Sequence, residues 1–86
     1  MNDEYKHTIK PASSFRHRIK NLSKENRERV LEKVDEICKG LIEGKMLRGK
    51  HQGERSLRVG IFRVIYEKPK YCIIIFKDVR NRETAY

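Results

Sequence analysis

The feature that most constrains the fold of this chain is an unbroken apolar stripe between residues 30 and 42. Its members recur at the spacing of an α-helix: Val30, Leu31, Val34, Ile37, Cys38, Leu41 and Ile42. Side chains at this spacing share one side of a helix, so the segment predicts an amphipathic helix with one side to bury. Ser23 is a suitable N-cap, Glu25 suits the positive end of the helix dipole, and Gly44 is expected to stop the helix. Such a helix needs a second layer to cover its apolar side.

A strand and a shorter helix are expected before this helix. Tyr5–Lys10 alternates weakly and stops at Pro11, which predicts a short first strand. Ser13 or Ser14 is then placed to cap a short helix. The apolar side of this helix consists of Phe15, Ile19 and Leu22. The two helices together are expected to form a hairpin laid on a sheet.

The second half of the sequence predicts three more strands. Residues 45–54 are typical of a basic, glycine-containing loop. The expected strands are Arg55–Val59, Phe62–Glu67 and Tyr71–Val79. The turns between these strands are so short that neighbours must be antiparallel. We therefore expect a single α+β domain over residues 1–86, with a two-helix hairpin packed on one face of a small, mainly antiparallel sheet, in the order β-α-α-β-β-β.

Positive charge is concentrated in the second half of the chain. Residues 1–44 contain 10 Lys/Arg and 8 Asp/Glu, whereas residues 45–86 contain 11 and 4, so the second half supplies +7 of the net +9. A localised basic surface attracts polyanions through phosphate contacts and counterion release. The alternatives are a basic protein whose charge serves only solubility, and one that binds an acidic protein partner.

Alternation along the expected strands separates apolar from basic side chains. The apolar positions expected under the helices are Leu57, Val59, Phe62 and Val64. This leaves Arg58 and Arg63 on the open face. Arg80 and Arg82 follow the last strand, and Tyr86 ends the sequence. Arginine binds phosphate through a fixed fork of donors and tyrosine stacks on bases, so an RNA-binding surface is predicted. Solvated arginines balanced by nearby glutamates are the alternative.

The sequence offers little for metal or redox chemistry. The histidines His7, His17 and His51 lie far apart without ligand spacing, so neither a metal nor another cofactor is expected. His51 is interpreted as a surface residue of the basic loop, with RNA contact or acid–base chemistry as the alternative. Cys38 and Cys72 fall on apolar segments and are interpreted as small core residues, which suits a reducing compartment. No apolar stretch approaches the about 20 residues of a membrane span, so a cytoplasmic protein without membrane partners is expected.

Four passages follow one another along almost the whole sequence. They are the helical hairpin before Met46–Gly49, the aromatic-Arg-apolar-apolar-Tyr pattern within Leu57–Tyr66, the apolar run Cys72–Phe76 and the arginine-containing ending Arg80–Tyr86. In this order and spacing they resemble the RelE-type toxins of the RelE/ParE superfamily. Each passage alone is unspecific, and the resemblance depends on the four together.

The resemblance implies the toxin component of a type II toxin–antitoxin system. Such a toxin is a metal-independent endoribonuclease, or mRNA interferase, that cleaves mRNA in the ribosomal A site and inhibits translation. The implied partners are a cognate RelB-like antitoxin, the ribosome and mRNA. By this resemblance Arg63 would hold the scissile phosphate, Arg80 would serve the leaving group, and Tyr86 would stack on or orient the substrate. The surrounding residues expected to bind RNA are Lys45, Arg48, Lys50, Arg55 and Arg82.

Two positions depart from the pattern of the family. Arg58 stands where bacterial members place a basic residue, often lysine, as a candidate base, and arginine hardly deprotonates. Ser56 replaces the basic residue expected two positions earlier, for which Arg55, Lys50 or Lys45 could compensate. The general base is therefore left open. The alternatives to this activity are a ParE-like toxin that inhibits gyrase and a non-catalytic RNA-binding domain.

Overall fold

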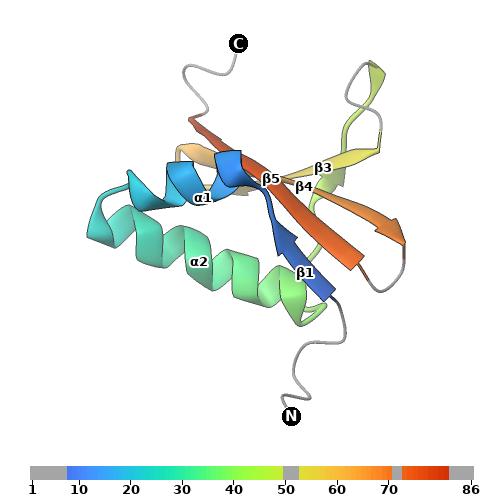
Figure 1. Ribbon diagram of the computed structural model, residues 1–86, viewed down its shortest axis with the longest axis horizontal. Helices are drawn as coiled ribbons and strands as arrows, with labels where there is room; N and C mark the ends of the chain where they lie inside the picture. The colour runs from blue at the N-terminus through green and yellow to red at the C-terminus, as the bar shows by residue number, and fades with distance from the viewer. Residues whose placement is uncertain (1–7, 50–52, 71–72, 82–86) are drawn as a thin grey trace.

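The computed structural model of the protein describes residues 8–49, 53–70 and 73–81, and its two helices lie on one face of a five-stranded sheet (Figure 1). In chain order the elements are β1 (Thr8–Pro11), α1 (Ser13–Lys20), α2 (Lys24–Cys38), β2 (Lys45–Met46), β3 (Glu54–Val59), β4 (Phe62–Lys70) and β5 (Ile73–Asn81). The expected α+β class, with a helical hairpin on a small sheet, is confirmed.

The sheet is mixed and has the strand order β1-β5-β4-β3-β2. All neighbours from β2 to β5 are antiparallel, whereas β1 pairs in parallel with the last strand, β5. The prediction of a loop throughout residues 45–54 is wrong at its start. There Lys45 pairs with Ser56 and Met46 pairs with Arg55 to form β2. Two residues are too few to show the alternation by which a strand is recognised in a sequence.

The first and last strands of the chain, β1 and β5, both end later in the sequence than expected. β1 is described from Thr8 to Pro11, and residues 5–7 of the expected strand lie outside the described residues. Proline is acceptable at the end of an edge strand, because its nitrogen is not needed as a hydrogen-bond donor there. β5 runs from Ile73 to Asn81, so Arg80 lies within this strand rather than after it. Tyr71 and Cys72 lie outside the described residues.

The long helix ends earlier than its apolar periodicity suggests. Gly40 has a φ of 75°, which is the left-handed conformation that glycine adopts just after a helix. The amide of Leu41 then donates to the carbonyl of Glu36 at 2.9 Å, which closes a Schellman motif. The expected stop at Gly44 is therefore wrong, and α2 ends at Cys38. Leu41, expected on the buried stripe, is 70% exposed.

The two helix starts differ in how they are capped. The Ser23 hydroxyl accepts the amide N–H of Asn26 at 3.3 Å, so Ser23 is the N-cap of α2 as expected. The expected caps of α1, Ser13 or Ser14, are wrong, because the N-cap is Ala12 and no side chain caps this helix. The Ala12 amide instead donates to the carbonyl of Phe76 in β5 at 2.8 Å. The tertiary contact with the sheet thus fixes the start of α1.

The core lies between the helices and the sheet. Its buried members are Phe15 from α1, Val30, Ile37 and Cys38 from α2, and Val59, Val64, Tyr66, Ile74, Phe76 and Val79 from the sheet. The ring of Phe76 packs between those of Phe15 and Tyr66, with centroid distances of 5.2 and 5.7 Å. The expected burial of the apolar strand positions under the helices is therefore confirmed for Val59 and Val64, while Leu57 and Phe62 pack partly buried beside them.

Gly44 holds the chain between α2 and β2 tightly against the sheet. Its amide donates a 2.6 Å hydrogen bond to the hydroxyl of buried Tyr66. A β-carbon at this position would lie 2.9 Å from the carbonyl oxygen of Ser56 and 3.1 Å from the Tyr66 ring. Glycine is therefore required by this close approach, and the contact fixes where the chain enters the sheet as β2.

Candidate nucleic-acid interface

Three arginines lie directly opposite one another across three neighbouring strands. Arg58 of β3 pairs with Arg63 of β4, and Arg63 pairs with Arg80 of β5. The adjacent row, Leu57–Val64–Val79, faces the helices, so alternation places the arginine row on the open face. Like charges directly opposite on a sheet destabilise it. Such a row therefore suggests a binding role, and polyanions are the natural ligands.

Arg80 enters this row through a β-bulge. The pairing of β4 with β5 shifts by one residue between Ile65 and Tyr66, and Lys77 is the extra residue of β5. A one-residue shift exchanges the two faces of a strand, so it decides which residues beyond it face the open side. Without the bulge, the residue before Arg80 would stand opposite Arg63. The basic row thus depends on a tertiary irregularity of the sheet.

The surface beside the row is hollowed next to β2, at the edge of the sheet. One hollow, of about 410 Å³, is lined by Glu43, Lys45, Leu47, Ser56, Leu57, Arg58 and Arg63. A second, of about 550 Å³, is lined by Lys45, Met46, Leu47, Arg48 and Arg63. Arg63 and Lys45 line both hollows, so the half-buried central arginine of the row stands beside an open, cation-lined groove.

The structure brings together only some of the residues expected to bind RNA. Lys45 and Arg48 are exposed along the groove, near Arg63. Arg55 lies apart from them, because its register partner is Tyr66 and its guanidinium donates to the carbonyl of Gly44 at 3.1 Å. Arg55 therefore holds the chain before β2 in place. Lys50, Arg82 and Tyr86, which are expected to contact RNA, lie outside the described residues, and so does His51.

The predicted site residues do not include the acidic residue that lies beside the arginine row. Asp78 of β5 lies 3.4 Å from the Nε of Arg80 and, with its other carboxylate oxygen, 3.4 Å from the Nε of Arg18 on α1. Asp78 is the only acidic residue between Glu67 and Glu83, which is the signal in the sequence that marks it.

Other chemistries find little support among the described side chains. No group of three or more His, Cys, Asp or Glu residues is arranged to hold a metal ion in this part of the chain. None of the described helices is both long and apolar enough to cross a membrane. Cys38 is buried, and its pKa is raised from 9.0 to about 11 by desolvation and by the nearby charge of Asp35. Its thiol therefore stays protonated near neutral pH and is a poor nucleophile.

Solved structures of other proteins share this fold. A chain of the toxin–antitoxin complex RelBE2 from Mycobacterium tuberculosis is 24% identical, with 88% of this chain and 98% of that chain covered and a TM-score of 0.64. A chain of the RelB–RelE antitoxin–toxin complex from Methanococcus jannaschii is 23% identical, with 90% and 94% covered and a TM-score of 0.71. YafQ from E. coli is 12% identical, with 93% and 98% covered and a TM-score of 0.78.

These similarities establish the class of fold. No protein-family model matches the sequence, and no curated protein matches it. The structural matches nevertheless span nearly the whole of each compared chain, so this protein has the RelE-type fold. The resemblance expected from the sequence is confirmed at this level. The chain thus combines a RelE-type fold with three arginines aligned on its open sheet face.

Proposed function

We propose that this chain is the toxin of a type II toxin–antitoxin pair and acts as a metal-independent endoribonuclease that cleaves mRNA on the ribosome and inhibits translation. The observation that carries the proposal is the row Arg58–Arg63–Arg80, aligned across three strands beside a cation-lined groove. Such a row costs the sheet stability, and phosphate binding is the function that offsets this cost. Residues 1–86 would act as one domain.

The proposed chemistry needs no nucleophile from the protein. The 2′-hydroxyl of RNA attacks the adjacent phosphate, forming a bond to phosphorus while the bond to the 5′-oxygen of the next nucleotide breaks. Negative charge grows on the phosphate oxygens and on the leaving oxygen. Arg63 would stabilise the first and Arg80 the second, because fixed donors act most strongly where charge develops. Tyr86 would stack on or orient the substrate.

The proposal assigns no residue as the general base. Arg58 lines the groove beside Arg63, but a guanidinium hardly gives up its proton. Arg58 is therefore assigned to phosphate binding, together with Lys45 and Arg48 on the groove. Lys50 and Arg82 are proposed to bind RNA on the strength of the sequence alone. Alignment of the attacking hydroxyl can supply much of the rate without a strong base. The ribosome would hold the mRNA in that alignment, and this activity places the protein in the cytoplasm.

An antitoxin is the second partner of the proposal. Two of the structures with this fold are named as complexes of a toxin with its antitoxin, RelBE2 and RelB–RelE. The basic open face would attract an acidic or amphipathic segment of a RelB-like antitoxin, which could fold as it binds. Co-expression with the small open reading frame next to the gene should yield a stable complex. If no neighbouring product binds and expression alone leaves growth unaffected, the toxin assignment is overturned.

The decisive test of the enzyme is single-turnover cleavage of ribosome-bound mRNA in the presence of a chelator. Arg63→Ala and Arg80→Ala should each lower the cleavage rate by about 10²–10³-fold, because each removes a donor that acts on the transition state. Ribosome affinity should change much less, since many cations share the phosphate contacts. Lys70→Ala, at the exposed end of β4, is the matched control and should cleave at the wild-type rate.

The same assay separates the competing functions. If Arg63→Ala and Arg80→Ala cleave at the wild-type rate, the catalytic assignment is wrong. If the wild type fails to cleave but blocks supercoiling by gyrase, a ParE-like activity replaces the proposal. Binding to ribosomes without cleavage and without an effect on gyrase would identify a non-catalytic RNA-binding domain.

A further inference from the structure

Asp78 joins an arginine of the sheet to an arginine of α1. Its Oδ2 lies 3.4 Å from the Nε of Arg80, and its Oδ1 lies 3.4 Å from the Nε of Arg18. Oδ1 also accepts the backbone N–H of Val79 at 2.8 Å. The side chain of Asp78 is only 16% exposed, so its carboxylate has a fixed direction.

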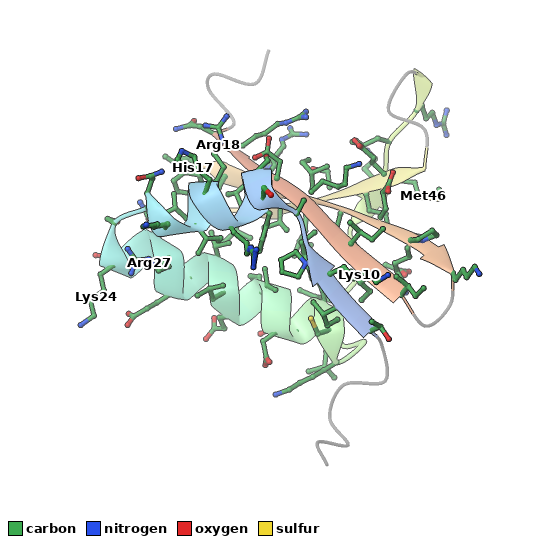
Figure 2. All side chains as sticks on the ribbon, in the orientation of Figure 1. Lys10, His17, Arg18, Lys24, Arg27 and Met46 are labelled. Carbon is green, nitrogen blue, oxygen red and sulfur yellow. The ribbon has the colours of Figure 1, made fainter. Side chains whose placement is uncertain are left out.

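The path of the chain explains how α1 reaches this carboxylate. β1 pairs with β5 only as far as the Pro11–Phe76 pair, and beyond that point α1 packs along β5. Arg18 extends from α1 toward the C-terminal end of β5, as Figure 2 shows. Asp78 shares a face with Arg80, which lies two residues further along the strand. Arg18 therefore meets the open face at the edge of the sheet, next to the end of the arginine row.

Both contacts use the Nε edge of a guanidinium. An arginine has five N–H donors, and four of them belong to its two terminal amino groups. Within residues 8–49, 53–70 and 73–81, Asp78 is the only carboxylate that Arg18 and Arg80 pair with. Their side chains are 61% and 39% exposed. As far as the described residues go, the terminal amino groups are therefore available to a further acceptor, in an orientation that the carboxylate restricts.

Stability alone accounts poorly for this arrangement. Ion pairs between partly exposed side chains contribute only about 0–1 kcal/mol. A carboxylate beside the arginine row also repels phosphate, so it weakens the field that attracts RNA. Orientation of the two guanidinium groups is the benefit that the geometry supplies, since fixed donors bind and stabilise charge without first having to reorganise.

We propose that Asp78 is a positioning residue that orients Arg80 toward the leaving oxygen at the scissile bond and Arg18 toward a neighbouring phosphate of the same RNA strand. The phosphate-binding row then continues from the sheet onto α1, and Arg18 is an additional RNA-binding residue. This inference rests on the proposed cleavage of RNA, which it deepens.

The role of Asp78 in cleavage is tested by a double-mutant cycle. Asp78→Asn keeps the shape of the side chain but loses its charge, and it should lower the single-turnover rate about 10- to 100-fold with little change in ribosome affinity. In the Arg80→Ala background the same substitution should change the rate less than about twofold, because its effect passes through Arg80. The rate should keep the pH profile of the wild type, since Asp78 transfers no proton. Additive losses, or a changed pH profile, would overturn the positioning role.

The role of Arg18 is tested by binding to a 2′-O-methyl RNA oligonucleotide, which cannot be cleaved. Arg18→Ala should weaken binding several-fold. It should also reduce the slope of log K against the logarithm of the salt concentration by about 0.7 in magnitude, as expected for one lost phosphate contact on a single strand. Arg16→Ala is the matched control, because Arg16 is an exposed arginine of the same helix. Equal effects of the two substitutions would show that only overall charge matters and would overturn the assignment of Arg18.

An NMR measurement, which does not depend on cleavage, tests this inference independently of the proposed function. The Nε–H NMR signals of Arg18 and Arg80 should shift in Asp78→Asn, while that of Arg29, which pairs with Glu25, should stay in place. Unchanged signals of Arg18 and Arg80 overturn the inference whether or not the protein cleaves RNA. If the wild type fails to cleave but these signals shift, the proposed function fails, and the Arg18 binding test alone decides the extended phosphate row.

Discussion

Two neighbouring rows of the same sheet have opposite physical roles. The row Leu57–Val64–Val79 and the row Arg58–Arg63–Arg80 are formed by the same three strands in the same register, one residue apart along each strand. The first lies under the helices, where Val64 is 0% exposed. The second lies on the open face, beside the groove lined by Arg63 and Lys45. A single step along a pleated strand thus separates the side chains that stabilise the fold from those proposed to bind RNA.

This separation explains how so small a protein can carry a destabilising row of charges. A chain of 86 residues has a modest core, and its stability depends on the apolar row and the aromatic side chains that extend it. Repulsion within the arginine row lowers stability on the other face. Substitutions on the helix-covered face should therefore change folding, and substitutions in the arginine row should change binding or catalysis with little loss of stability.

The largest effect is expected from the aromatic cluster of the core face. Phe76→Ala removes a ring that packs against Phe15 and Tyr66, and the free energy of unfolding should fall by about 3–5 kcal/mol. Urea denaturation followed by circular dichroism measures this loss. Phe62→Ala, at a partly buried position, is the control and should cost less. A loss below about 1 kcal/mol for Phe76→Ala would contradict the central place of this cluster.

A smaller loss is expected where the chain before β2 meets the sheet. Gly44→Ala would place a methyl group 2.9 Å from the carbonyl oxygen of Ser56, so either the segment or the sheet must move. The free energy of unfolding should fall by about 1–3 kcal/mol. The groove should also lose its shape, because Lys45 follows directly in β2. Wild-type stability in urea for Gly44→Ala would show that this contact is not tight.

Alkaline pH should lower the free energy of unfolding through the ionisation of Cys38 in the core. The pKa of this thiol is raised to about 11 in the folded protein, from 9.0, so folding favours its protonated form. The contribution of the protonated Cys38 thiol to the free energy of unfolding is complete below pH 9 and is lost as the pH rises toward 11. Each unit of difference between the folded and unfolded pKa corresponds to about 1.4 kcal/mol. The gap in unfolding free energy between wild type and Cys38→Ala should therefore narrow by about 1–2 kcal/mol over this range. A constant gap would contradict the raised pKa.

The smallest effect, and one of opposite sign, is expected on the open face. Arg58→Thr removes one member of the like-charged row and introduces a residue that favours strands. The free energy of unfolding should rise by about 0.2–1 kcal/mol, while RNA binding weakens. At high salt the gain should shrink, because screening already reduces the repulsion. Destabilisation by Arg58→Thr at low salt would contradict the assignment of this row to function rather than to folding.

Part of the arginine row follows from local sequence alone. Gly60 has a φ of 60° in the two-residue turn that joins Val59 to Phe62, as expected for the first central position of a type II′ hairpin. Such a turn fixes the register of the two strands, so Arg58 must stand opposite Arg63. Alternation then predicts that both arginines share the face away from the apolar side chains, which the structure confirms.

The sequence by itself determined the local features of this protein: the start of α2, the alternation of its strands and the Arg58–Arg63 pair. These follow from periodicity and turn geometry, which act over a few residues. The tertiary structure alone decided that Arg80 completes the row and that Arg18 meets Asp78. The first depends on a bulge at Lys77, and the second on α1 packing along β5 beyond the end of β1. Both are long-range contacts, and the spacing of residues along a chain does not predict which distant segments will pack together.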